Sequence, residues 1–428
     1  MKVIKYPKRE DWPTMCRRPE KDFSDLSASV ASVLSDVRAR GDAAVREYTK
    51  RFDGAEIDAL EVSEEEKHEA MQTISGELLD AIDTAHNNVR AFHEAQLFEG
   101  RKVETMRGIT CWQKSIPIER VGLYVPGGTA PLFSTVLMLA TPAMIAGCRE
   151  VVMCTPPDRH GRINPAILAA AAMSGVKHIY KCGGVQAVGA MAYGTETVPK
   201  VFKIFGPGNQ YVMAAKQQVS LHDVAIDMPA GPSEVCIIAD EGADISFVAA
   251  DLLSQAEHGA DSQVVLITTA EEVVSRVMVE TDRQLRDLPR RDIARLALES
   301  SMIILVNDTA EAIDFANAYA PEHLILHTDD YAELAEHVVN AGSVFLGRYA
   351  CESAGDYASG TNHTLPTHGW AVSYNGVNLD SFCRKVTFQH LTAEGVQNIG
   401  RAVEVMAEAE SLHAHKNAMT LRMAAIKE

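Results

Sequence analysis

Between about residues 120 and 350, short apolar runs alternate with segments whose apolar residues recur every three or four positions. The runs with the length of strands are 121–125, 151–154, 178–182, 203–205, 235–239, 264–268, 302–306, 324–327 and 343–346. The intervening segments that predict helices are 165–174, 209–219, 245–258, 271–288, 310–318 and 331–340. Strands that alternate with helices in this way are typical of βαβ units and parallel sheet. Nine strands are many for one sheet, so the pattern favours two α/β lobes.

Helical patterns flank this block on both sides. Residues 23–53 carry apolar residues on one face with a break at Gly41, and residues 64–98 are helical and strongly charged. After residue 376 the apolar positions again have helical spacing. The expected fold is therefore α/β, with two parallel-sheet lobes of incomplete Rossmann-like type and helical N- and C-terminal appendages. The expected parts are an N-terminal arm (1–22), a first α/β lobe (23–123 with 233–375), a second α/β lobe (124–232) and a C-terminal helical domain (376–428).

One uncharged stretch, residues 130–147, approaches the length of a membrane-spanning helix. It contains Pro131, Pro142 and several hydroxyl side chains, so a helix buried under a sheet is the better interpretation. The first ten residues lack the apolar core of a secretory signal. We therefore expect no membrane association.

The chain has 428 residues, with 40 Lys and Arg against 58 Asp and Glu, and a formal charge of −18. This acidic balance argues against nucleic acid or an anionic membrane as the main partner. The eight cysteines form no CxxC pair, which argues against a zinc ribbon or a disulfide scaffold. These features are typical of a globular protein of the reducing cytoplasm.

Three glycine-rich turns follow predicted strands and lead into predicted helices, at 121–131, 182–187 and 205–210. Small residues at such turns let backbone amides approach an anion at a helix N-terminus. The dinucleotide fingerprint GxGxxG is absent, because Tyr211 stands where the third glycine would be. The turns fit a nucleotide ligand, and they fit equally well the tight connections of any such sheet.

A second group of residues could bind a metal ion. Gln255 and His258 are three residues apart near the predicted end of a helix at Gly259, which puts both on one face, although a capping role is also open. Asp356 and His363 lie in a polar stretch, 352–363, that we expect to be a functional loop. Mixed oxygen and nitrogen donors suit zinc or another first-row metal rather than calcium.

Two further fragments carry acid and base side chains. Glu322 and His323 come directly before a predicted strand, where they offer two bases of different pKa, or simply a surface Glu beside a helix-terminal His. Glu410 and His415 are about 140° apart on a regular helix, so both reach one site only if the helix bends or ends between them. A solvated helix is the other interpretation of that fragment.

Together these fragments resemble the histidinol dehydrogenase family. The resemblance rests on long motifs in the family's order, from roughly residue 23 to the C-terminus. They are Ile226 to Val235 running on to Ser-Gln-Ala-Glu-His (254–258), Leu-Tyr-Val-Pro-Gly-Gly (123–128), Phe-Gly-Pro-Gly-Asn (205–209), Pro-Glu-His-Leu (321–324), Ser-Ala-Gly-Asp-Tyr-Ala-Ser-Gly-Thr-Asn-His-Thr-Leu-Pro-Thr (353–367) and Ala-His-Lys-Asn-Ala (414–418).

The resemblance implies a zinc-containing homodimer that oxidises L-histidinol to L-histidine in two NAD-dependent steps, the last of histidine biosynthesis. By motif position, the implied zinc ligands are Gln255, His258, Asp356 and His415, and the implied catalytic pair is Glu322 and His323. The implied substrate contacts are Ser233, His363 and Glu410 together with the zinc ligands and His323, and the implied NAD contacts are Tyr124, Gln186 and Asn209. Because the family's dimer is intertwined, we expect His415 and Glu410 to serve the partner's site.

Elementary chemistry agrees with these roles. An alcohol loses hydride when a base removes its hydroxyl proton, and neutral His323 suits that step. The aldehyde must then gain water, which Glu322 can activate. We expect zinc to hold the imidazole and amino nitrogens of the substrate. The alternatives are a relative that oxidises another polyol such as a sulfonated diol, a thiol-dependent aldehyde dehydrogenase, and a non-enzymatic metal- or nucleotide-binding protein.

Overall fold

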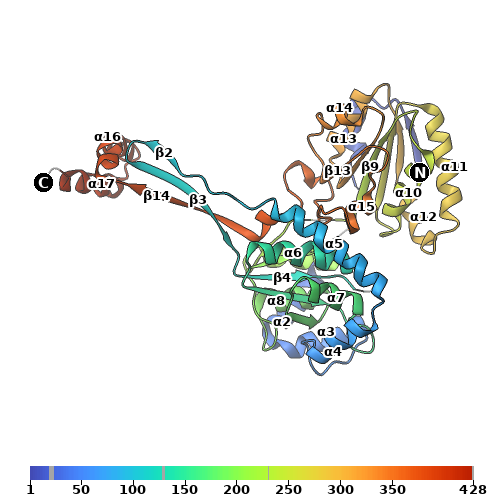
Figure 1. Ribbon diagram of the computed structural model, residues 1–428, viewed down its shortest axis with the longest axis horizontal. Helices are drawn as coiled ribbons and strands as arrows, with labels where there is room; N and C mark the ends of the chain where they lie inside the picture. The colour runs from blue at the N-terminus through green and yellow to red at the C-terminus, as the bar shows by residue number, and fades with distance from the viewer. Residues whose placement is uncertain (19–23, 128–130, 230, 427–428) are drawn as a thin grey trace.

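The structure is a computed structural model, and it describes residues 1–18, 24–127, 131–229 and 231–426. Figure 1 shows two α/β lobes and a long, thin arm that projects from the lower lobe and carries the C-terminus at its tip. Two separate parallel sheets form the centres of the lobes. The expected α/β class with two parallel-sheet lobes is thus confirmed, and the start of the first predicted helix at Phe23 lies outside the described residues.

The first sheet has five parallel strands in the order β6-β5-β4-β7-β8. They are β4 (Arg120–Tyr124), β5 (Glu150–Thr155), β6 (His178–Lys181), β7 (Lys203–Phe205) and β8 (Ala225–Ile226). The helices between them are α6 (Phe133–Ala146), α7 (Pro165–Met173), α8 (Gly184–Tyr193) and α9 (Gln210–Ser220). Two clusters of buried apolar side chains pack this lobe. Within the uncharged stretch 130–147, whose first residue lies outside the described residues, Phe133–Ala146 form the largely buried helix α6. No helix among the described residues is long and apolar enough to cross a membrane.

Four N-terminal helices complete this lobe: α2 (Ser24–Arg40), α3 (Asp42–Asp53), α4 (Glu64–Thr73) and α5 (Gly76–Glu94). Helix α2 packs on α8 and α9, α4 packs on α7, and α5 packs on α6. This differs from the expected grouping of residues 23–123 with the other lobe. The apolar face of α2 packs so closely on α8 that a Cβ at Gly189 would lie 3.2 Å from Val37 and 3.3 Å from Leu34. An apolar helix face in a sequence does not say which sheet it will cover.

The second sheet has six parallel strands in the order β1-β11-β10-β9-β12-β13. They are β1 (Lys2–Lys5), β9 (Glu234–Ala239), β10 (Gln263–Thr268), β11 (Met302–Leu305), β12 (His323–His327) and β13 (Ser343–Leu346). The helices are α1 (Trp12–Met15), α10 (Ile245–Ala256), α11 (Glu271–Leu285), α12 (Arg291–Glu299), α13 (Thr309–Tyr319), α14 (Tyr331–Ala335) and α15 (Glu352–Tyr357). The expected N-terminal arm is instead part of this lobe, because β1 pairs with β11. Helix α14 is shorter than the predicted 331–340.

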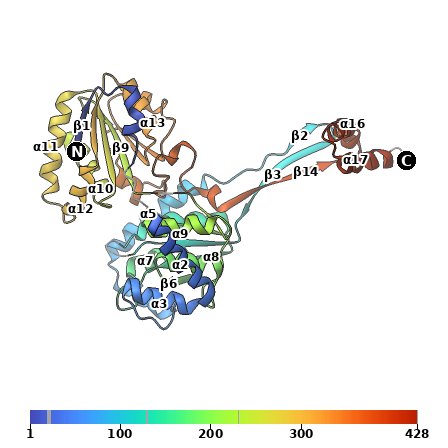
Figure 2. The same cartoon turned by 180° about the vertical axis from the view of Figure 1, so that it is seen from behind.

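The arm is built on a long antiparallel pair of strands. Strand β3 (Ile109–Pro117) pairs along its whole length with β14 (Cys383–Leu391), and β2 (Val103–Met106) joins the outer end of β3. Helices α16 (Ala393–Ala409) and α17 (His413–Ala425) form the tip, as both views show (Figures 1 and 2). The expected wholly helical domain at 376–428 is wrong in this respect, because it contains β14. Short 3-10 helices occur at Arg9–Asp11, Trp370–Val372 and Leu379–Phe382.

Candidate active site and metal centre

A cavity of about 2290 Å³ opens between the two lobes. The five-stranded lobe contributes the carboxyl ends of its strands, including Tyr124 and the turn at Gly206. The six-stranded lobe contributes residues at the starts of β9 and β12, among them Ser233 and Glu322. The cavity therefore faces both glycine-rich turns and the acid and base residues that the sequence singled out.

The catalytic pair predicted from the sequence lies buried at the start of β12. Glu322 is 5% exposed and His323 is 3% exposed, which rules out the alternative of a surface Glu beside a helix-terminal His. The Glu322 carboxylate accepts a hydrogen bond from the Glu234 backbone N–H at 3.0 Å and lies 3.7 Å from His323 Nδ1. On the other side of the ring, His323 Nε2 lies 3.5 Å from Asp356 Oδ1.

The pKa values of both side chains of this pair differ strongly from their usual values. Burial raises the pKa of Glu322 to about 8, although the neighbouring His323 opposes the shift. Burial works against a charged His323, but the carboxylates of Glu322, Glu352 and Asp356 outweigh it and raise the His323 pKa to about 10. The surrounding carboxyl groups therefore favour the cationic form of His323 in the chain without a metal. The sequence did not reveal how many carboxyl groups surround the ring.

Potential metal ligands from helix α15 and from the turn after α10 meet beside this pair. One ligand atom each from His258, Glu352 and Asp356 lies within 4.8 Å of the other two. Glu352 and Asp356 are four residues apart on α15, so they share one helix face. The expected loop at 352–363 thus begins with a short helix, which contacts α10.

Gln255 and His258 come together, but by a different local structure from the one predicted. Helix α10 ends at Ala256, so His258 lies in the turn beyond it, and its backbone N–H donates to the Gln255 carbonyl at 3.2 Å. Gln255 is fully buried, and both polar atoms of its amide lack a hydrogen-bond partner among the described residues. A buried amide without partners is costly unless a ligand or ion binds it.

Sequence reasoning missed Glu352. It is 1% exposed, and both carboxylate oxygens lack a hydrogen-bond partner within the described part of the chain. Burial and the neighbouring carboxyl groups of Asp356, Glu322 and Asp251 raise the pKa of Glu352, so its charged form is stable only beside a cation. Its spacing of four from Asp356 was the available signal, but the surrounding residues have no apolar period that would have predicted a helix.

Other predicted substrate contacts also face the cavity. His363 and Ser233 both line it. Burial lowers the pKa of His363, and its Nε2 is buried without a partner among the described residues. His363 is thus a neutral ring that can accept or donate a hydrogen bond to a ligand.

The predicted nucleotide contacts cluster at the carboxyl edge of the five-stranded sheet. The Tyr124 hydroxyl accepts a hydrogen bond from the Gly184 N–H at 3.2 Å. Gln186 is fully buried, and its amide has no partner in the described chain. Asn209 caps α9, since its side chain accepts from Tyr211 N and Val212 N at 3.0 and 3.2 Å. The structure brings all three to the cavity.

Gly206 allows the close approach of two strands at this edge. Its φ is +128°, and a Cβ there would lie 2.1 Å from the Tyr124 carbonyl oxygen. The buried Lys216 donates to the Gly206 carbonyl at 2.7 Å and pairs with Asp227 at 2.5 Å. The Asp227 carboxylate in turn accepts from Gly206 N at 2.8 Å, so this ion pair fixes the turn.

Glu410 and His415 do not join the site of their own chain. Both are exposed at the tip of the arm, far from the cavity (Figures 1 and 2). Helix α16 ends at Ala409 and α17 begins at His413. The chain therefore has the break between the two residues that a shared site would require.

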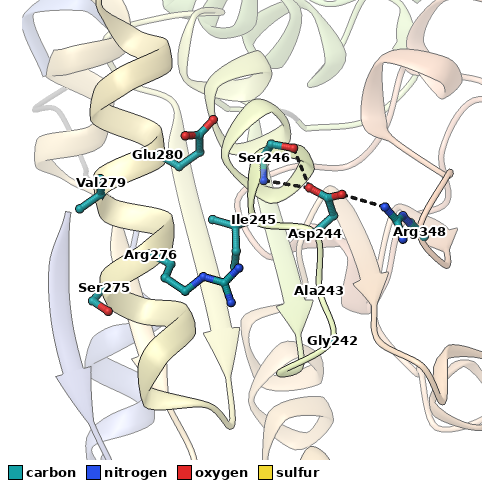
Figure 3. A pocket seen from close by; sticks show the side chains of 10 residues that line it. All are labelled: Gly242, Ala243, Asp244, Ile245, Ser246, Ser275, Arg276, Val279, Glu280 and Arg348. Carbon is teal, nitrogen blue, oxygen red and sulfur yellow. Dashed lines mark hydrogen bonds and ion pairs between the residues drawn. The ribbon is translucent and has the colours of Figure 1, made fainter.

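A second hollow lies at the start of α10, at the far end of β9 from the catalytic pair (Figure 3). Its main polar group, Asp244, accepts hydrogen bonds from Ser246 N and Oγ and pairs with Arg348 at 2.9 Å. Asp244 is thus engaged by groups of the protein itself.

Known proteins resemble the chain along its whole length. Residues 16–423 match the family model described as histidinol dehydrogenase. The chain is 61% identical over 427 residues to histidinol dehydrogenase of Bacteroides thetaiotaomicron, with 100% of both chains covered. It is 51% identical to that of Escherichia coli over 96% of this chain and 94% of the relative. A crystal structure of histidinol dehydrogenase from Elizabethkingia anophelis superposes with a TM-score of 0.98 at 51% identity, covering 100% and 99% of the two chains.

Proposed function

Because the chain belongs to the histidinol dehydrogenase family and is an oxidoreductase that acts on histidinol in histidine biosynthesis, we propose that it carries L-histidinol through histidinaldehyde to L-histidine with NAD and a zinc ion. The observation that carries this proposal is the buried Glu322–His323 pair beside the ligand atoms of His258, Glu352 and Asp356. This arrangement combines two bases with a cation site at one end of a large cavity.

The metal would be held by Gln255, His258 and Asp356, with His415 of the partner completing the set. The unpartnered Gln255 amide and the surplus of buried carboxylate support this assignment. Zinc supplies a Lewis acid without redox chemistry and orients nitrogen ligands of the substrate. A divalent cation bound to Asp356 and His258 would also offset the negative charge around His323 and lower its pKa toward working pH.

The dinucleotide would bind at the carboxyl edge of the five-stranded sheet, against Tyr124, Gln186 and Asn209. The unpartnered Gln186 amide and the cavity that all three line support this position. NAD, when bound there, supplies the acceptor for a hydride in each oxidation. The cavity is lined by residues of both lobes, so a substrate beside Glu322 and a dinucleotide at Tyr124 would share one space.

Two residues divide the proton transfers. In the first oxidation, His323 takes the hydroxyl proton of histidinol as the carbinol carbon loses hydride. The aldehyde must then be hydrated, and Glu322 removes a proton from the attacking water. Loss of a hydride and a proton from the neutral hydrate gives the carboxylic acid, which loses one more proton to become the carboxylate of histidine. Ser233, His363 and the partner's Glu410 hold the polar groups of the substrate.

The arm would bring Glu410 and His415 to a second copy of the chain. Helix α17 has no buried residue, and apolar side chains of the tip are exposed, including Met406 and Leu421. An extended arm with a helical tip of this kind needs a partner surface. We propose a homodimer with sites shared between subunits, working in the cytoplasm, where eight cysteines without disulfides are suited.

The test of the proposed function is stoichiometric. Purified protein is supplied with zinc, excess NAD and a limiting amount of L-histidinol, and NADH is counted by absorbance. Two NADH per histidinol, with histidine as product, are expected. A yield of one, or reduction of NAD only with other polyols, would overturn the four-electron oxidation of histidinol.

A further inference from the structure

The carboxylate of Asp53 lies at the cavity, on the side of the proposed dinucleotide site. It is the last residue of α3 and lines the same cavity as Tyr124, Gln186 and Asn209. Its Oδ2 is buried and lacks a hydrogen-bond partner among the described residues. Burial raises the pKa of Asp53 to about 6, so the group is mainly ionised at neutral pH. The mechanism described above makes no use of this acceptor.

The surroundings of Asp53 match a ligand that has hydroxyl groups and a flat ring. Its negative charge adds to burial in raising the pKa of both Tyr124 and Cys182, so it is close to the carboxyl ends of β4 and β6. Next to it, the rings of Tyr48 and Phe52 stack at 5.6 Å, and Phe52 is 54% exposed. Aromatic surface beside a hydroxyl acceptor is a combination that suits an adenosine group.

We propose that Asp53 accepts hydrogen bonds from the adenosine ribose hydroxyls of the dinucleotide and thereby selects NAD over NADP. This inference rests on the proposed dinucleotide site. An ionised carboxylate is an acceptor only, so it binds a ribose diol but repels a 2′-phosphate. Acidic side chains perform this task in other dinucleotide-binding folds.

Other charged residues that line the cavity bear on whether NADP can bind after Asp53 is replaced. Arg51 and Arg162 also line it, so cations that could meet a 2′-phosphate are already present. Asp158 also lines the cavity, but its Oδ1 already accepts from His160 N at 2.8 Å and Arg162 N at 3.0 Å, whereas Asp53 Oδ2 has no partner among the described residues. Removing the Asp53 charge should therefore both weaken NAD binding and admit NADP.

The experiment compares kcat/KM for NAD and NADP in the zinc-loaded dimer and in Asp53→Asn and Asp53→Ser. We expect kcat/KM for NAD to fall about 10-fold through KM, and the NAD/NADP ratio to fall about 100-fold or more, because each lost or gained charged contact changes binding by about tenfold. Asp58→Asn is the matched control, since it removes an exposed carboxylate from the same segment and should leave the ratio unchanged.

Each outcome separates this inference from the proposed function. An unchanged NAD/NADP ratio in both variants, whether activity persists or falls equally with both cofactors, overturns the role of Asp53. Failure of the unaltered enzyme to reduce NAD with histidinol would instead overturn the proposed function. A measurement that needs no variant is calorimetric binding of ADP-ribose and its 2′-phosphorylated analogue to the unaltered protein. Equal affinity for the two would also contradict selection at this position.

Discussion

Arg18 forms a bidentate salt bridge with Glu234, in which Nε lies 2.7 Å from Oε2 and Nη2 lies 2.7 Å from Oε1. The same Nη2 donates to the Tyr319 carbonyl at 2.6 Å, and the guanidinium lies over the Tyr319 ring at 3.6 Å. The backbone N–H of Glu234 holds the Glu322 carboxylate. The N-terminal segment therefore ties together the start of β9 and the chain that leads into the catalytic pair.

Replacing Arg18 by Met should destabilise the protein strongly. The pair is buried, with 8% and 1% of the two side chains exposed, so the change leaves the Glu234 carboxylate without its counter-charge. The expected loss is about 3–5 kcal/mol in the free energy of unfolding. Urea denaturation measures it, with Arg9→Met as the control, because the Arg9–Asp314 pair is exposed and should contribute less than about 1 kcal/mol. An equal loss of unfolding free energy in the two variants would contradict the stabilising role of the Arg18–Glu234 salt bridge.

The two catalytic bases should be separable by supplying the intermediate. His323→Gln removes the base for the alcohol, so it should slow the first oxidation by about 10²–10⁴-fold. Glu322→Gln should mainly slow oxidation of supplied histidinaldehyde, because the residue acts on water. NADH formation from each substrate is followed in both variants, with circular dichroism as the check on folding. Equal losses on both substrates in both variants would remove the division of labour.

Glu352→Gln should weaken retention of the metal. The Glu352 carboxylate is buried and lies close to the ligand atoms of His258 and Asp356, and the amide keeps its volume while removing its charge. We expect metal affinity to fall about 10–100-fold, as for other residues that support a metal site. The readout is zinc per chain after dialysis against graded chelator. Glu257→Gln, a neighbour outside that group, is the control, and identical retention in the two variants would exclude Glu352 from the site.

Asp251 should make the metal-free protein less stable as pH rises. Burial raises the pKa of this carboxyl from 3.8 to about 7. Between these values the folded chain keeps a proton that the unfolded chain has lost, so stability decreases with rising pH, by up to about 1.4 kcal/mol per unit. Asp251→Asn should abolish this part of the slope. Urea unfolding in chelator from about pH 5 to 7.5 measures it, and parallel slopes for both proteins would contradict the assignment.

Most strands of both sheets could be predicted, and the clearest of them are apolar on both faces. Strands β1 and β8 were not predicted, because they are short and not buried. β9 and β10 are buried at every position, and a continuous apolar run is the pattern of a strand inside a parallel sheet. β2 is exposed throughout and β14 is only partly buried, so neither has a pattern that predicts a strand. These strands are held by backbone hydrogen bonds to β3 in the arm, and the side-chain pattern of the sequence does not indicate this pairing.

The candidate site likewise has features that the sequence predicts and features that it does not. Residues such as His258 and Asp356 could be proposed as metal ligands from the sequence, because a motif is recognised from the order of its residues without knowledge of packing. The pKa of His323 could not, because it depends on Glu352 and Asp356, which approach the ring only after α15 packs on α10. Glu352 itself has no motif signal from its immediate neighbours. Long-range packing is therefore what the sequence leaves undetermined here.

The arm leads to a prediction about two chains. His415 is exposed at the tip, while His323 lies in the body of the same chain, far from it (Figure 1). If His415 serves the partner's site, then His415→Asn and His323→Gln chains complement each other in a mixed dimer. One site then contains both changes, and the other contains neither.

Co-expression of the two chains with different tags tests this arrangement. Each homodimer should be inactive, because both of its sites lack one essential residue. A tandem-purified heterodimer should recover about half of the full activity, since one of its two sites is intact. As a control, His323→Gln chains are paired with Glu322→Gln chains. Both changes then lie in the catalytic pair, so each site of this heterodimer contains one of them and no activity should be recovered. If His415 acted in its own chain, each site of the first heterodimer would still contain one change, and no activity would return.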